Sequence, residues 1–253
     1  MYIDSHAHLS SEDFDVDRDE LISSLTDNGI DYVIEIGADI KGSKSAVSLS
    51  KKYDNVYVAV GMHPECADTF SDSDFDILES LAKESKVLAI GEIGLDYHYD
   101  YDKDKQKELF IKQILLADKL NLPIVVHLRD AYQDMEIILK EYKKYINNGI
   151  LFHCYCGSKE MVKVFSFLDP YYAFGGAITF KNNNRADTIK AIPLDRLLLE
   201  TDCPYMSPVP YRGKRNSPLN IPIIAERMGD DLGMSKEDIG KITSENARRF
   251  FRF

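Results

Sequence analysis

The sequence of 253 residues contains no apolar run long enough to span a bilayer, and no basic segment followed by an apolar stretch at its start. We therefore expect no membrane partner and a cytoplasmic location. The sequence also has no linker rich in proline, glycine or serine, no low-complexity tract and no repeat. Its length suits one large α/β domain, so we predict a single domain over residues 1–253.

Basic side chains are fewer than acidic ones, with 31 Lys and Arg against 42 Asp and Glu and a formal net charge of -11. This balance argues against a protein that holds DNA mainly through a basic surface, because counterion release requires clustered Lys and Arg. It does not exclude an enzyme that acts on phosphodiesters, since bound divalent cations supply positive charge at the phosphate.

Cysteines are few, and none has the paired CxxC spacing of structural zinc or redox motifs. Cys154 and Cys156 form a CxC pair, which is too close for the usual disulfide, while Cys66 and Cys203 are isolated. We predict free thiols near the core. Thiolate ligation of a metal remains an alternative, although histidine and carboxylate side chains already supply enough ligands.

Short apolar runs alternate with amphipathic stretches along the chain. The runs predict eight strands: Tyr2–Ser5, Tyr32–Ile36, Tyr57–Val60, Val87–Gly91, Ile124–Val126, Ile150–His153, Tyr171–Phe174 and Leu197–Glu200. The stretches between them predict helices: Asp17–Asn28, Lys44–Tyr53, Asp74–Glu84, Lys103–Leu120, Ala131–Asn147, Lys159–Leu168 and Arg185–Ile192, with two more in Ser217–Phe253. Alternation of strands and helices favours a parallel sheet, and eight units predict an α/β fold of the (β/α)8 TIM-barrel type.

Four histidines and two carboxylates lie at or just past the ends of five predicted strands: His6 and His8, Glu92, His127, His153 and Asp202. A barrel brings these C-terminal strand ends to one face, where barrel enzymes have their sites. Imidazole and carboxylate ligands suit divalent cations, and a carboxylate such as Glu92 can bridge two of them. The set predicts a hydrolase site for two divalent cations, and magnesium, manganese and zinc are all compatible with it.

Other polar residues follow the strands singly. His63 in GMHPE could donate to a phosphate oxygen or protonate a leaving alkoxide, or shape a turn before proline. Asp4, Asp130 and Glu200 could orient the ligand imidazoles, or close a strand or cap a helix. His98 could belong to the site or to a solvated loop.

A local basic cluster follows the eighth predicted strand in the segment PYRGKRNSP, which contains Arg212, Lys214 and Arg215. Guanidinium groups match phosphate oxygens, and loops after the last strands of a barrel often bind phosphate. A solvated charged loop is the alternative. The position beside Asp202 favours phosphate binding.

The motifs IDSHAHL, GMHP, AIGEIGLDY, PIVVHLRDA, FHCYCGS and ETDCPYMSPVPYRGKRNSP closely resemble the TatD family of metal-dependent deoxyribonucleases, within the wider amidohydrolase-like barrels. The resemblance covers nearly the whole chain. It implies that the six residues named above are metal ligands and that His63 is a site histidine. It also implies a cytoplasmic enzyme that hydrolyses DNA phosphodiesters, in some members from the 3′ end, with magnesium or another divalent cation.

The sequence departs from the family pattern at three positions, none of which is an implied ligand. Glu65 stands where a second histidine is frequent, Cys156 where serine is usual, and Ser217 where glutamate is usual. Glu65 adds negative charge near the site and could alter substrate preference or metal choice. Relatives with a carboxylated lysine place it at the end of strand four, where this chain has Glu92, so the glutamate-bridged branch is favoured.

We therefore expect a deoxyribonuclease that uses a metal-activated water, with DNA, single-stranded or at strand ends, as its substrate partner. Asp202, Glu92 and His63 are the expected catalytic residues, and His63, Arg212 and Arg215 are expected to bind substrate oxygens. Two alternatives remain. The first is a hydrolase of the same fold that acts on an ester, amide or aminoacyl-tRNA bond, and the second is a metal-binding or scaffold protein without catalysis. The sequence gives no indication of an oligomeric state.

Overall fold

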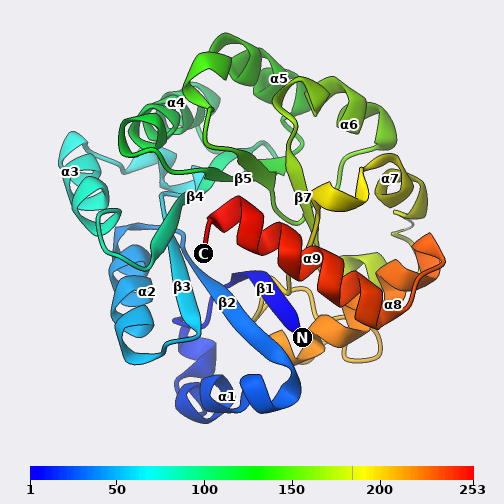
Figure 1. The fold of residues 1–253 in the computed structure, drawn as a ribbon. Helices are drawn as coiled ribbons and strands as arrows, with labels where there is room; N and C mark the ends of the chain where they lie inside the picture. The colour runs from blue at the N-terminus through cyan, green and yellow to red at the C-terminus, as the bar shows by residue number, and fades with distance from the viewer. Residues whose placement is uncertain (184) are drawn as a thin grey trace.

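The structure is a computed structural model that describes residues 1–183 and 185–253. Eight parallel strands follow one another in chain order around a nearly closed barrel (Figure 1). The strands are β1 Tyr2–Ala7, β2 Ile30–Gly37, β3 Val56–Val60, β4 Val87–Asp96, β5 Ile124–Arg129, β6 Ile150–Phe152, β7 Tyr171–Phe174 and β8 Leu197–Leu199. The predicted TIM barrel is confirmed.

The barrel closes between its first and last strands through a small number of contacts. A parallel bridge joins Ala7 to Cys203, just beyond β8. The hydroxyl of Ser5 donates to the carbonyl of Leu199 at 2.9 Å, and the N–H of Asp202 donates to the carbonyl of His6 at 2.9 Å. The segment that contains Asp202 is thereby hydrogen-bonded directly to the segment that contains the first histidines.

Helices surround the barrel and are generally shorter than the amphipathic stretches predicted. They are α1 Arg18–Ser24, α2 Ile40–Lys52, α3 Asp72–Leu81, α4 Lys103–Leu120, α5 Tyr132–Glu141, α6 Lys159–Phe165, α7 Ala186–Ala191, α8 Ile221–Leu232 and α9 Lys236–Phe251. Helix α4 has the predicted bounds, between the N-cap Asp102 and a left-handed Asn121. The stretches predicted to end at Asn28 and Asn147 instead finish in separate 3-10 turns, because the apolar pattern does not distinguish a 3-10 turn from a continued helix.

Helix α9 crosses the end of the barrel at which the strands begin (Figure 1). Its Ala247, Phe250 and Phe251 pack in one buried cluster with residues from the strands, including Ile34 and Leu151. This end is therefore filled with apolar side chains. Polar side chains that act on a ligand have room only at the opposite end, where the strands finish.

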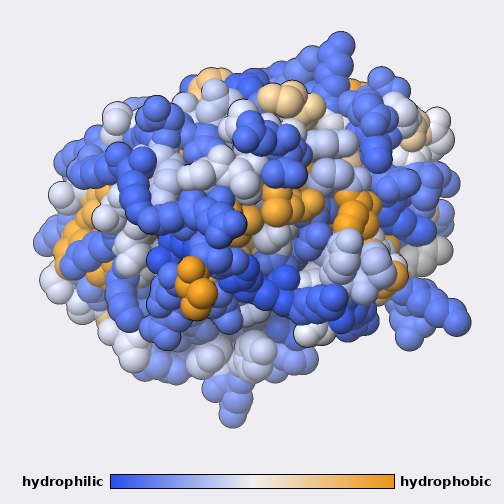
Figure 2. All heavy atoms as spheres, turned by 90° about the horizontal axis from the view of Figure 1, so that it is seen from below, coloured by the Kyte–Doolittle hydropathy of each residue, from blue (hydrophilic) through white to orange (hydrophobic). Residues whose placement is uncertain are grey.

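The surface does not present an extended apolar region on the face drawn in Figure 2, where hydrophobic residues form small separate groups among hydrophilic ones. Within residues 1–183 and 185–253, no helix combines the length and apolar character that crossing a membrane requires.

Candidate metal centre

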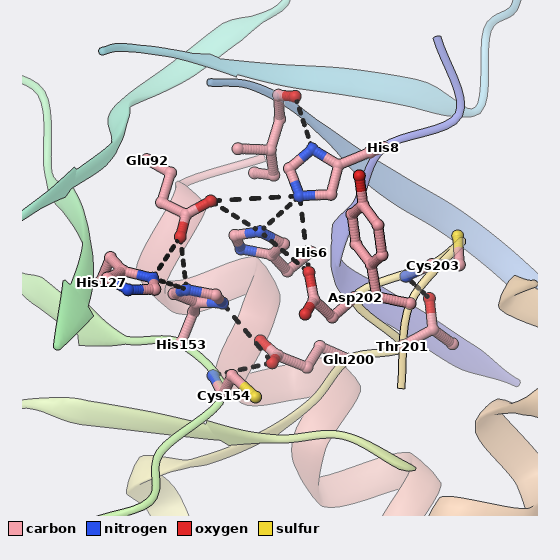
Figure 3. A network of polar contacts seen from close by, with 12 residues as sticks. His6, His8, Glu92, His127, His153, Cys154, Glu200, Thr201, Asp202 and Cys203 are labelled. Carbon is pink, nitrogen blue, oxygen red and sulfur yellow. Dashed lines mark hydrogen bonds and ion pairs between the residues drawn. The ribbon is translucent and has the colours of Figure 1, made fainter. Parts of the chain in front are cut away.

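The six predicted ligands converge at the C-terminal end of the barrel (Figure 3). His6 and His127 lie within β1 and β5, and Glu92 lies within β4, which continues to Asp96 rather than ending at the predicted Gly91. The others lie past strand ends: His8 and His153 directly follow β1 and β6, and Asp202 is three residues beyond the end of β8. Five strands separated in sequence therefore contribute side chains to one cluster, as the sequence predicted.

Glu92 lies between two groups of imidazoles. Its Oε2 is 3.4 Å from Nε2 of His6 and 4.0 Å from Nε2 of His8. Its Oε1 is 2.8 Å from Nδ1 of His127 and 2.6 Å from Nε2 of His153. Each oxygen of one carboxylate thus faces a different pair of histidines, which is the arrangement that a bridging ligand requires.

Asp202 lies beside the first of these groups. Its Oδ1 is 3.4 Å from Nε2 of His8 and 3.7 Å from Nε2 of His6, and the two Nε2 atoms are 3.3 Å apart. Across the cluster, the ring of His6 stacks on that of His153 with centroids 3.9 Å apart. Asp202 is therefore placed to share a cation with His6, His8 and one oxygen of Glu92.

The donor set fits divalent cations. Ligand atoms within 4.8 Å of one another form three groups among the described residues: His6, His153 and Asp202; His6, His8 and Glu92; and His63, Glu92 and His127. In this buried cluster, Nδ1 of His6 and Nδ1 of His153 have no hydrogen-bond partner. Imidazole nitrogens and carboxylate oxygens at such spacing suit magnesium, manganese or zinc.

Without a cation, carboxylates raise the pKa of His8, His127 and His153, whereas burial and the charge of His153 lower the pKa of His6. Burial lowers the pKa of His8, but the carboxylates of Asp202 and Glu92 outweigh burial and raise it to about 9. Burial would raise the pKa of Glu92, yet His153, His127 and His6 hold that pKa well below its usual value. A cation that binds here must displace protons from the imidazoles, so its affinity should rise with pH.

Two acceptors orient ligand imidazoles through hydrogen bonds, and a third lies farther away. Oδ2 of Asp96 lies 3.0 Å from Nε2 of His127, and the carbonyl of Ile36 lies 3.1 Å from Nδ1 of His8. Oε1 of Glu200 lies at a longer 3.7 Å from Nδ1 of His153. Such partners fix the ring orientation and increase ligand basicity. Oε1 of Glu200 accepts a hydrogen bond from the N–H of Cys154 at 2.7 Å, so its role in orienting His153 stays a prediction.

The role of Asp96 was not predicted. Asp96 lies four residues after Glu92 on the same strand, and side chains alternate along a strand, so the two share one face. This spacing was the available signal in the sequence.

Two further buried carboxylates hold the backbone around the ligands. Asp4 accepts hydrogen bonds from the N–H and hydroxyl of Thr201, so it fixes the junction of β1 and β8 rather than an imidazole ring. Burial raises the pKa of Asp4 to about 7 despite these bonds. Glu35, which the sequence analysis missed, accepts from the backbone N–H groups of Leu9 at 2.6 Å and Ser10 at 2.8 Å.

Other candidates lie outside the cluster. His98 and Asp130 are exposed and pair with each other at 3.4 Å, so Asp130 does not orient a ligand imidazole. The cysteines are free thiols, as predicted, but Cys156 is exposed rather than near the core, because it follows the end of β6 in a surface loop. No metal group found in the described part of the chain includes a cysteine.

His63 lies at the edge of the cluster, with Nε2 3.9 Å from Oε1 of Glu92. Its Nδ1 accepts a hydrogen bond from the N–H of Glu65 at 3.2 Å. Burial lowers the pKa of His63 to about 4, so the ring is neutral near pH 7. A neutral imidazole with an accepting Nδ1 carries its proton on Nε2, which makes His63 a hydrogen-bond donor directed toward the cluster.

A cavity of about 460 Å³ opens onto the ligands and is lined by His8, His63, Glu92, Asp202 and Tyr205 among others. The predicted basic loop lies beyond Tyr205. There, Arg215 forms a two-point ion pair with Asp17 at 2.7 and 2.5 Å, which engages both terminal nitrogens.

Arg212 differs from Arg215. It lies over the ring of Phe180 at 4.0 Å, and no carboxylate of the described residues forms an ion pair with it. Of the two arginines, Arg212 therefore has its charge available for a ligand.

Comparisons with known proteins agree with this geometry. A family model described as TatD related DNase matches residues 3–252. The chain is 42% identical to a Bacillus subtilis protein named uncharacterized metal-dependent hydrolase YabD, over 100% of this chain and 99% of the relative. It is 30% identical to a Cronobacter sakazakii protein named 3'-5' ssDNA/RNA exonuclease TatD, over 96% and 95% of the two chains.

Among solved structures, YJJV, a TatD homolog from Escherichia coli K12, matches with a TM-score of 0.93 and 26% identity, over 100% of this chain and 98% of that one. The fold, the ligand cluster and the extent of these matches agree. The chain belongs to the TatD family of metal-dependent hydrolases.

Proposed function

We propose that this hydrolase cleaves phosphodiester bonds of single-stranded DNA from its ends, with two divalent cations bound in the cluster. The observation that carries the proposal is the position of Glu92, whose two oxygens face different pairs of histidines beneath an open cavity. One cation would be held by His6, His8 and Asp202, and the other by His127 and His153. When bound, the cations would supply Lewis-acid polarisation of the phosphate and lower the pKa of a water molecule.

Asp202 orients that water and accepts its proton. Burial would raise the pKa of Asp202, but the hydrogen bond with His8 and the charges of His6 and His153 lower it. The carboxylate is therefore ionised at neutral pH and can act as an acceptor. Its side chain is partly exposed, at 16%, so one oxygen can be reached from the cavity.

His63 donates its Nε2 proton to a non-bridging phosphate oxygen. A donor already in place stabilises the charge that grows on this oxygen in the transition state. Protonation of a leaving alkoxide is less suited to His63, because a neutral imidazole with a pKa of about 4 is a weak proton source near pH 7.

Arg212 supplies a second positive contact for the phosphate chain, whereas Arg215 is largely committed to Asp17. The basic loop is also the observation that favours phosphate over a carbonyl centre. The same activated water would serve ester or amide hydrolysis, but small esters and amides give no reason for an unpaired arginine beside the cavity of an acidic protein. An aminoacyl-tRNA also carries phosphates, so the arginine does not separate it from DNA.

The test is nucleotide release from a single-stranded DNA oligonucleotide labelled at either end, with magnesium, manganese or zinc and with a chelator. We expect release only with a cation, at least 100-fold slower in Glu92→Ala, and unchanged within about threefold in the control Lys241→Ala on α9. Undiminished release in chelator, or full activity of Glu92→Ala, would refute the proposal. A panel of nitrophenyl esters, amides and aminoacyl-tRNA tests the carbonyl alternative under the same conditions.

A further inference from the structure

A second cavity of about 470 Å³ lies next to the metal cavity, and Tyr205 lines both. The second cavity is lined by Phe180, Arg212, Lys214 and Asp13, and we call it the loop groove. The side chain of Tyr205 is 59% exposed, and its ring meets that of His8 edge-on with centroids 6.1 Å apart. A chain molecule that leaves the metal cavity past Tyr205 therefore enters the loop groove.

The loop groove combines aromatic rings with cations that have no acidic partner. Arg212 lies 4.0 Å from the centre of the Phe180 ring, and Lys214 lies 5.8 Å from the centre of the Tyr211 ring. Neither cation forms an ion pair with a carboxylate in the described part of the chain. The carboxylate of Asp13, the one acidic side chain that lines the groove, accepts a hydrogen bond from the hydroxyl of Ser11 at 2.9 Å. Aromatic rings and free cations together are what single-stranded nucleic acid binds.

Hydrogen bonds hold the walls of this groove in place. The buried Asn216 donates to the carbonyl of Tyr205 at 2.7 Å and to that of Thr201 at 2.8 Å. The hydroxyl of Ser207 donates to the carbonyl of Lys214 at 2.6 Å. The loop is thus tied to the segment that contains Asp202, so a strand bound in the groove would be held in a defined position relative to the metal ligands.

A different part of the metal cavity wall is acidic, and we call it the acidic rim. Asp39 and Glu65 line it, and Lys41 is the single Lys or Arg that lines this cavity. Burial raises the pKa of Glu65, and the nearby carboxylates of Glu92 and Asp39 add to this rise. A phosphate chain is repelled at this rim and attracted at the loop groove. The metal cavity therefore has one favourable exit for a polyanion.

We propose that the loop groove binds the part of a single-stranded nucleic acid that remains after cleavage, while the acidic rim restricts the other side of the scissile phosphate to a terminal nucleotide. Tyr205 stacks on the base at the boundary, and Arg212 and Lys214 contact the next phosphates. This inference rests on the proposed function and adds to it the reason why cleavage occurs at ends.

The test compares kcat/KM for oligothymidylates of two, four, eight and twelve nucleotides, in wild type, Lys214→Glu and the charge-matched control Lys241→Glu on α9. We expect kcat/KM to rise at least tenfold from the dinucleotide to the longer chains in wild type and in Lys241→Glu. In Lys214→Glu, the ratio between twelve and two nucleotides should fall toward one. Binding of fluorescent twelve-nucleotide oligothymidylate in chelator should weaken about tenfold, with a slope against log salt reduced by about 0.7.

The outcomes separate the two proposals. The proposal that the loop groove binds the strand is contradicted if turnover does not depend on length, or if Lys214→Glu leaves the length dependence intact. The proposed function stands in either case. Absence of turnover at every length with each cation overturns the proposed function. In that case, equal binding of the labelled oligonucleotide by Lys214→Glu and Lys241→Glu overturns the groove as well, whereas selective weakening in Lys214→Glu supports it as a binding site.

Discussion

Nε2 of His153 lies 2.6 Å from Oε1 of Glu92, while the second oxygen of the same carboxylate faces His6 at 3.4 Å. Glu92 is 4% exposed, so these contacts are shielded from solvent. Both halves of the ligand cluster therefore depend on one buried carboxylate. Loss of its charge should affect cation binding on both sides at once.

Glu92→Gln tests this dependence with little change in side-chain volume. An amide has one acceptor oxygen and no charge, so we expect cation content after dialysis to fall by more than half and kcat/KM to fall at least 100-fold. A cation at about 100 times its Kd stabilises a protein by about 2.7 kcal/mol, so the rise in Tm on cation addition should largely disappear. Elemental analysis and thermal unfolding are the measurements.

Glu65→Gln is the matched control for this change. Glu65 is half-exposed at 54% and lies at the cavity mouth, 3.9 Å from His63. The Glu65→Gln variant should retain the full cation content and the full rise in Tm on cation addition. Equal cation content in wild type and Glu92→Gln would contradict a bridging role for Glu92.

Asp96→Asn tests the positioning of a ligand. Oδ2 of Asp96 is 3.0 Å from Nε2 of His127, on the side of the ring away from Glu92. Loss of this charge should lower cation affinity by about 10- to 100-fold, because such partners set ring orientation and basicity. Titration of metal-free protein by calorimetry measures the affinity. Asp130→Asn is the control, since that exposed carboxylate pairs with His98 and with no ligand imidazole among the described residues. An equal loss in both variants would contradict a specific role for Asp96.

The metal ligands could be predicted because the fold leaves little freedom. Each one lies at the C-terminal end of a strand, and a barrel places all such ends on one face. His6 and His8 share a face because they are two residues apart on an extended segment. Composition and strand order were therefore sufficient to predict that His127, His153 and Asp202, which come from three other strands, lie in the same cluster.

The supporting residues could not be predicted in the same way. Asp4 and Asp96 lie on β1 and β4, two strands that also carry metal ligands. Asp4 accepts a hydrogen bond from the backbone of Thr201, whereas Asp96 contacts the ring of His127. The difference depends on register and side-chain direction, which the apolar pattern does not define. Arg215 illustrates a second limit, because its partner Asp17 lies 198 residues away in the sequence.

His63→Gln and His63→Ala separate hydrogen-bond donation from proton transfer. If Nε2–H donates to phosphate, His63→Ala should lower kcat about 100-fold, and His63→Gln should recover part of this loss because its amide also donates. Cation content should stay unchanged in both variants. A loss of cation in His63→Ala would instead make His63 a ligand, as its proximity to Glu92 and His127 allows. Kinetics and elemental analysis of the same preparations distinguish the two roles.

Metal-free and metal-loaded protein should respond differently to pH. In the metal-free state, Asp202 and Glu92 outweigh burial and raise the pKa of His8 to about 9, and Glu92 and Glu200 hold the pKa of His153 well above its usual value. Unfolded histidine titrates near pH 6.5, so between about 6.5 and 9 the folded state holds more protons than the unfolded state. The free energy of unfolding therefore falls as pH rises through this range. His63, with a pKa of about 4, has the opposite effect only below about pH 6.5.

A cation reverses this trend, because it binds the deprotonated imidazoles and its stabilisation grows with pH. We expect Tm in chelator to fall between pH 6.5 and 8.5, and the difference between manganese-loaded and chelated protein to widen. His8→Gln should flatten both changes, whereas His98→Gln, outside the cluster, should show the wild-type profile. Proton displacement from the cluster by the cation would be contradicted if the Tm in chelator rose with pH, or if the difference in Tm between manganese-loaded and chelated protein stayed constant.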